Sequence, residues 1–142
     1  MKNRILFLAM IAFLPLAGSS VFSQPDSREN NADDLVILWT SDDPYVAERV
    51  ALMYTHAAKT SGWFSNVTLI IWGPSAKLTS ENIKIQEKLA AMQKDGVVIE
   101  ACIACANMYG IADNLKELGF DVKGMGRPLT EYLKSGAKVL TF

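Results

Sequence analysis

The sequence lacks the features that several classes of protein require. Its 142 residues include only two cysteines and one histidine, which excludes a disulfide-dense scaffold and a four-ligand zinc site made from these residues alone. Its 14 lysines and arginines are balanced by 15 acidic residues, so no basic field attracts nucleic acid or an anionic membrane. We therefore expect no nucleic-acid partner and no metal. The 50% of hydrophobic residues fits one globular domain.

The first 23 residues have the layout of a secretory signal peptide. Lys2 and Arg4 precede an apolar run over residues 5–17, and small residues follow it. The run is shorter than the ~20 residues of a membrane-spanning helix, so we expect no stable membrane anchor. The leader predicts an exported protein, periplasmic or secreted, in an oxidising compartment.

Signal-peptide cleavage is expected after Ser19 or Ser23. Residues 24–33 are polar and show no apolar period, which indicates a flexible N-terminal arm. The folded domain is expected over residues 34–142.

Apolar runs alternate with helical patterns along this domain. Strands are predicted over residues 35–39, 67–72, 97–102, 120–123 and 138–142, and helices from Pro44 to the glycine at 62 and over 79–94, 104–118 and 128–135. Alternation at this spacing predicts an α/β fold, a three-layer sandwich with a mostly parallel sheet of about five strands flanked by helices.

The carboxyl ends of parallel strands share one edge of a sheet, and ligands bind beyond that edge. Four segments are expected there: Ser41–Asp43, Gly73–Ser75, Cys102–Cys105 and Gly124–Arg127. The last of these contains neither a dinucleotide fingerprint nor a phosphate loop, so no cofactor is expected.

The most informative pattern is the pair Cys102 and Cys105, where a predicted strand gives way to a predicted helix. Backbone amides and the helix dipole at such a junction favour a thiolate, which is the nucleophilic form. Arg127 is the candidate cation beside it. Three other interpretations stay open: buried inert cysteines, a redox-active dithiol, and a metal site with His56 that lacks a fourth ligand.

Other residues at this edge are candidates for a substrate pocket. Trp72, Tyr109, Ser41 and Asp42 join Arg127 in this set. For the aromatic residues, Trp39 included, packing in the core is the competing interpretation, and for Asp42 and Asp43 it is capping of the helix that follows.

The sequence also resembles the DsrE/DsrF-like family of small sulfur-metabolism proteins over most of the predicted domain. The segments that carry the resemblance are Thr40–Pro44, Val67–Gly73, Gly96–Cys102, Gly110–Ile111 and Met125–Glu131.

The resemblance implies a parallel α/β fold, assembly into homo-trimers or homo-hexamers, and a cysteine that carries sulfur as a persulfide. That cysteine maps to Cys102, with Cys105 auxiliary, and the partners are then a small sulfur donor and an acceptor thiol. Two alternatives remain open: a non-enzymatic oligomeric module that binds a ligand or partner, and an extracytoplasmic thiol-disulfide oxidoreductase.

Overall fold

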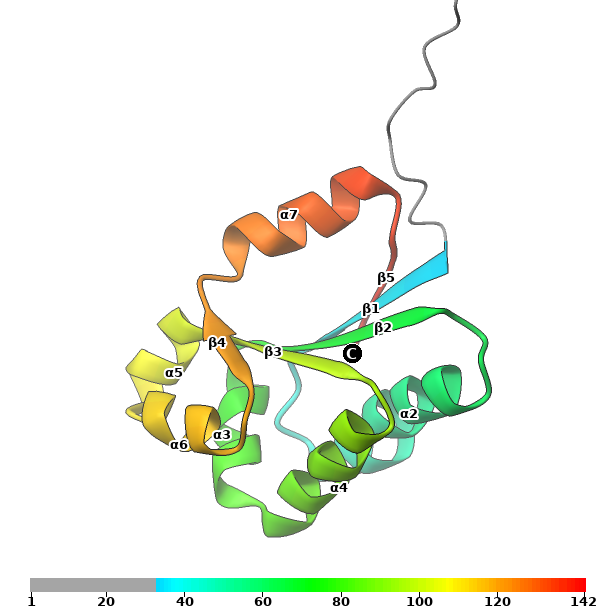
Figure 1. The fold of residues 1–142 in the computed structure, drawn as a ribbon. Coiled ribbons are helices and arrows are strands. Elements are labelled where there is room, and N and C mark those ends of the chain that lie inside the picture. The colour runs from blue at the N-terminus through cyan, green and yellow to red at the C-terminus, as the bar shows by residue number, and fades with distance from the viewer. Residues whose placement is uncertain (1–32) are drawn as a thin grey trace, which may run out of the picture.

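The computed structural model describes residues 33–142 and shows one twisted sheet with helices on both faces (Figure 1). The strands are β1 (Asp34–Trp39), β2 (Asn66–Ile71), β3 (Val98–Cys102), β4 (Asp121–Lys123) and β5 (Lys138–Thr141). All pair in parallel in the order β4-β3-β2-β1-β5. The predicted fold class is confirmed, and each predicted strand is present within one residue at either end.

The helices connect successive strands. They are α1 (Pro44–Val46), the π-helical η2 (Ala47–Ala51), α2 (Leu52–Thr60), α3 (Pro74–Glu81), α4 (Ile83–Lys94), α5 (Ile103–Tyr109), α6 (Ala112–Glu117) and α7 (Gly126–Ser135). Within residues 33–142, none of these helices is long and apolar enough to cross a membrane. The predicted signal peptide, residues 1–23, and the predicted arm up to residue 32 lie outside the described residues.

The helix predicted over residues 79–94 is wrong at its start, because two helices replace it. Pro74 begins α3, a position that suits proline because its missing N–H would have no partner there. Asn82 then separates α3 from α4. Its side-chain oxygen accepts hydrogen bonds from the backbone N–H groups of Lys84 (3.1 Å) and Ile85 (3.3 Å), which caps a new helix.

The helix predicted over residues 104–118 is also divided. Gly110 has a φ of +69° and ends α5 in the left-handed conformation, which glycine adopts without a Cβ clash. The N–H of Ile111 turns back to the carbonyl of Ala106 at 2.9 Å. This break leaves α5 as a short helix that directly follows Cys102 and contains Cys105.

The two faces of the sheet are covered unequally. Helices α2, α3, α4 and α6 cover one face, while α7 lies alone across the other (Figure 1). The larger core includes Ile37, Trp39, Leu69, Ile71, Ile85, Leu89 and Leu115, all fully buried. The smaller cluster under α7 has only four buried members, Val36, Ile70, Cys102 and Met125.

The chain changes face between β3 and β4. The carboxyl end of β3 leads into α5, whose Ala106 packs in the larger core, whereas the carboxyl end of β4 leads into α7 on the opposite face. Neighbouring strands whose connections diverge in this way leave a crevice where ligands bind in open α/β sheets. The two cysteines lie at this point.

Candidate functional site

Cys102 is the last residue of β3, next to Lys123 of β4 in the sheet register. Its side chain is 4% exposed and packs under α7 with Ile70 and Met125. Alternation along β3 places it on the same face of the sheet as Glu100. The thiol therefore lies at the predicted edge, but beneath a cover of apolar side chains.

Cys105 lies in the first turn of α5 and is partly exposed. Both thiols are free rather than joined. Burial raises the pKa of the Cys105 thiol, the neighbouring Cys102 thiol raises it further, and the backbone N–H of Gly73 acts in the opposite direction. Cys105 thus lies close to both Cys102 and the loop after β2, which brings two of the four predicted edge segments together.

The loop after β2 is held by Ser75. Its buried hydroxyl donates to the carbonyl of Trp39 (2.6 Å) and accepts from the N–H of Trp72 (3.0 Å). Hydrogen bonds to both strand ends fix the position of Gly73 beside Cys105. The Trp72 side chain packs against the cluster that contains Cys102, so this predicted pocket residue does lie beside the cysteines.

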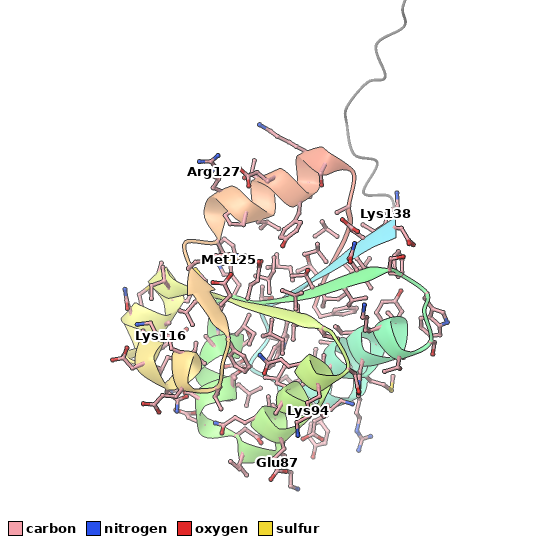
Figure 2. All side chains as sticks on the ribbon, viewed as in Figure 1. Glu87, Lys94, Lys116, Met125, Arg127 and Lys138 are labelled. Carbon is pink, nitrogen blue, oxygen red and sulfur yellow. The ribbon has the colours of Figure 1, made fainter. Side chains whose placement is uncertain are left out.

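Arg127 does not lie beside Cys102. Its Nε donates to Glu131 Oε1 at 2.7 Å, and its side chain is 88% exposed; Figure 2 shows it on the outer side of α7. Glu131 lies one helical turn after Arg127, which is the spacing at which opposite charges pair. The predicted role of Arg127 as the cation beside the Cys102 thiol is therefore not supported by its position.

The remaining predicted pocket residues make local hydrogen bonds or are exposed to solvent. Ser41 accepts a hydrogen bond from the N–H of Asp43 (3.1 Å), Asp42 is exposed, and Asp43 caps the helix through the N–H of Tyr45 (2.7 Å). Tyr109 is 39% exposed at the far end of α5. The capping interpretation of this acidic pair is thus correct for Asp43.

The three aromatic residues form no common pocket. Trp39 is fully buried in the larger core, while Trp72 packs on the opposite face of the sheet. Core packing is the correct interpretation for Trp39. His56 lies between α2 and α4, since Lys88 Nζ lies 2.6 Å from its Nδ1 and Asp95 Oδ2 lies 2.6 Å from its Nε2.

A second polar group lies under α7, and no sequence pattern predicted it. Glu100 Oε1 accepts from Lys123 Nζ (2.7 Å) and from the Tyr132 hydroxyl (3.3 Å). Lys123 Nζ also donates to Asp121 Oδ2 (2.5 Å). Hydrogen bonds to Asp121 first and then to Glu100 raise the pKa of Lys123, so its ammonium stays charged.

These side chains border a cavity of about 310 Å³ between the sheet and α7. Its lining is Glu100, Lys123, Pro128, Glu131, Tyr132 and Ser135. The signal in the sequence was a single charge inside the apolar run Val97–Cys102, because a buried strand rarely holds a carboxylate without a partner.

No cluster of three or more histidine, cysteine or acidic residues suitable for a metal ion occurs within residues 33–142.

The chain matches the model of one protein family, the DsrE/DsrF-like family, over residues 34–142. A search of curated proteins finds no match.

Two solved structures are similar. A conserved protein of unknown function from Bacteroides thetaiotaomicron is 38% identical over 80% of this chain and 98% of its own, with a TM-score of 0.77. The YchN protein from E. coli is 18% identical over 77% of this chain and 97% of its own, with a TM-score of 0.60, a likeness that concerns the fold alone.

Proposed function

Since this chain belongs to the DsrE/DsrF-like family, we propose that it carries sulfane sulfur as a persulfide on the pair Cys102 and Cys105. The observation that supports the proposal is the meeting of two free thiols at the carboxyl edge of the sheet. They lie where the connections after β3 and β4 diverge, the place where such sheets bind ligands.

The unequal exposure of the two thiols suggests an order of transfer. Cys105 is partly exposed, whereas Cys102 is 4% exposed, and the rate of thiol exchange depends on access. Sulfur therefore enters at Cys105 and passes to Cys102, where the apolar cover keeps reductants away. Cys102 remains the residue that stores the sulfur, and Cys105 is the auxiliary thiol.

Each transfer is a displacement at sulfur with no net oxidation. The Cys105 thiol loses its proton to water, and its thiolate attacks the outer sulfur of a persulfide or polysulfide donor. The S–S bond next to that sulfur breaks. A persulfide donor leaves as its thiolate, and a polysulfide donor leaves as a sulfide or polysulfide anion that is one sulfur shorter. The Cys102 thiolate then attacks the outer sulfur of the Cys105 persulfide and displaces the Cys105 thiolate. An acceptor thiolate removes the sulfur by the same reaction.

Export and assembly are part of the proposal. The leader at residues 1–23 directs the chain out of the cytoplasm, so the donor and acceptor are small thiol compounds of an extracytoplasmic space. We propose a trimer or hexamer of identical chains. Mass analysis of the N-terminus of the exported protein, expected at residue 20 or 24, and light scattering measure these two properties.

The test of sulfur carriage uses inorganic polysulfide as the donor and intact mass as the readout. The wild type gains one sulfur, about 32 Da. Cys105→Ala loads about tenfold more slowly because the entry thiol is lost, while Cys102→Ala loads but gives its sulfur up faster to added reductant. Equal loading of the wild type and the double variant Cys102→Ala/Cys105→Ala would contradict the proposal, as would a wild type that gains no sulfur.

The same adjacency of two free thiols also favours a second candidate, a thiol-disulfide oxidoreductase. In that case polysulfide oxidises the wild type to an internal disulfide, and the protein loses two hydrogens instead of retaining a sulfur. Reversible formation of this disulfide in a glutathione buffer, together with no retained sulfur at any time, would select this alternative.

A further inference from the structure

The cavity between α7 and the ends of β3 and β4 is separate from the thiol pair, although it lies on the same face of the sheet. From α7 it is lined by Pro128, Glu131, Tyr132 and Ser135, whose spacing places them on one side of the helix. Its floor is Glu100 of β3 and Lys123 of β4. The volume of about 310 Å³ is at the lower end of the range for small-molecule pockets.

One side-chain oxygen of Glu100, a residue of the cavity lining, has no hydrogen-bond partner among the described residues. Glu100 is 4% exposed, and its Oε2 has no hydrogen-bond partner among residues 33–142. A buried carboxylate oxygen without a donor costs free energy, because it has lost its hydrogen bonds to water and no protein hydrogen bond replaces them. Rotation about the last torsion of Glu100 is broad and nearly two-fold, so an incoming donor can pair with the carboxylate while Lys123 keeps its own bond.

The charges at the cavity favour a positive donor. Its lining holds the carboxylates of Glu100 and Glu131 against the single ammonium of Lys123. That ammonium already donates to Asp121 as well as to Glu100. Glu131 is paired with Arg127 at 2.7 Å, and the two side chains are 60% and 88% exposed, so solvent weakens the fields of both charges at the cavity. An anion would therefore meet the buried Glu100 carboxylate, whereas a cation would add to the hydrogen bonds of Glu100.

The remaining lining suits the carbon skeleton of an amine. Pro128 and the ring of Tyr132 present apolar surface, and an aromatic face attracts an ammonium group. The Ser135 hydroxyl donates to the carbonyl of Tyr132 at 2.9 Å, which leaves its lone pairs as further acceptors. We infer that this cavity binds a small organic ammonium compound, with Glu100 as its main partner.

The test titrates wild-type protein with n-butylammonium chloride and, separately, with sodium butyrate, which match in chain length and differ in the sign of charge. Amide chemical shifts report where each probe binds. We expect n-butylammonium at millimolar concentrations, the range for a fragment of this size, to shift the amides around Glu100, Lys123 and Tyr132. Butyrate should leave them unchanged.

Variants assign the effect to the carboxylate. Glu100→Gln should weaken n-butylammonium binding about tenfold, whereas Glu117→Gln, an exposed acid on α6, should not change it. If Glu100→Gln fails to fold, Glu131→Gln at the rim replaces it, with about a threefold weakening expected from the loss of one charge.

Three results would overturn the inference: equal shifts from both probes, no shift from either, or undiminished binding by the carboxylate variant. No shift from either probe would mean that water alone completes the hydrogen bonds of Glu100. Glu100→Gln retains Cys102 and Cys105, so we expect it to load sulfur like the wild type even if it no longer binds n-butylammonium. Loss of amine binding and loss of sulfur loading can therefore be told apart.

Discussion

The two faces of the sheet differ in what they contain. The face covered by α2, α3, α4 and α6 is lined by apolar side chains, nearly all fully buried. The face under α7 holds a buried carboxylate, an ammonium, a tyrosine hydroxyl and both thiols, and α7 itself has no fully buried residue. Stability therefore comes mainly from one face, and the thiols and the buried ion pair lie on the other.

The rule for crossover connections explains this division. Strands β1 to β4 follow one another in one direction across the sheet, so right-handed connections place their helices on one face. Only the return from β4 to β5 crosses the other face, and it carries one helix. A helix is about 10 Å wide and strands are about 4.8 Å apart, so α7 covers about two of the five strands, and the cavity lies between it and the sheet.

The largest expected effect is a contrast between two leucines, one for each face. Leu69→Ala removes a fully buried side chain of the larger core and should cost about 2–5 kcal/mol of unfolding free energy. Leu129→Ala removes a partly buried side chain from α7 and should cost about 1 kcal/mol, since less apolar area is lost. Urea unfolding measures both, and equal losses would contradict the division between the faces.

The next effect concerns the ion pair under α7. Lys123→Met leaves Glu100 buried with only the Tyr132 hydroxyl as a partner. The expected loss is about 1–2 kcal/mol, less than for a fully buried pair, because the Lys123 side chain is 37% exposed. The control is Lys134→Met, at an exposed lysine of α7, which should change stability little.

The pH dependence of this effect has a defined sign. The pKa of Lys123 is raised in the folded protein, so the folded state keeps the proton longer than the unfolded chain. The stabilisation is therefore complete below a pH of about 10.4, the ordinary lysine pKa, and is lost as the pH rises through the folded value. Unfolding of the wild type and of Lys123→Met from pH 8 upward should show their difference shrinking only above about pH 10.

Tyr132 acts in the same direction and must be separated from Lys123. Burial, and then the charge of Glu100, raises the pKa of Tyr132, so its phenol also holds its proton longer in the folded state. The free energy of unfolding falls above a pH of about 10, where Tyr132 ionises in the unfolded chain but not yet in the folded one. Repeating the comparison in a Tyr132→Phe background removes this contribution. A wild-type loss centred below pH 9 would rule out both groups as the cause.

The contrast between the faces also shows what the sequence could reveal. Apolar runs bounded by glycine, proline and aspartate predicted β1, β2 and β3, because burial on both faces leaves a continuous pattern. Shorter runs predicted the edge strands β4 and β5, whose residues are exposed or partly buried. The pairing of Glu100 with Lys123 was hidden, since it depends on the register of β3 against β4 and not on spacing along the chain. The hydroxyl of Tyr132 donates to Glu100 from 32 residues further along the chain.

The position of the thiols was predictable only in part. The change from strand to helix placed Cys102 at the carboxyl edge, as the structure has it. Its cover by Met125 comes from a distant segment, which local patterns do not encode. The ion pair of Arg127 could have been predicted from the sequence, because Glu131 follows four residues later and a helix brings side chains at this spacing together.

A smaller effect concerns the turn that ends α5. Gly110→Ala places a Cβ at a φ of +69° with no other atom within 4 Å, so the cost is backbone strain alone, about 1 kcal/mol. Gly124→Ala is the matched control, because Gly124 has no positive φ and open space around it. It should change the unfolding free energy by less than about 0.5 kcal/mol. Stabilisation of Gly110→Ala would mean that α5 and α6 can join into one helix.

The smallest effect is a shift in the reactivity of one thiol. The pKa of Cys105 is raised, chiefly by burial and further by Cys102, so less thiolate forms at neutral pH than for a free cysteine. Alkylation by iodoacetamide, read by peptide mass, should therefore reach half its maximal rate above a pH of about 8.5. In Cys102→Ala the midpoint should move down but stay above this value, because burial is the larger cause. A midpoint below it in the wild type would mean that the backbone N–H of Gly73, which lowers the pKa of Cys105, outweighs burial.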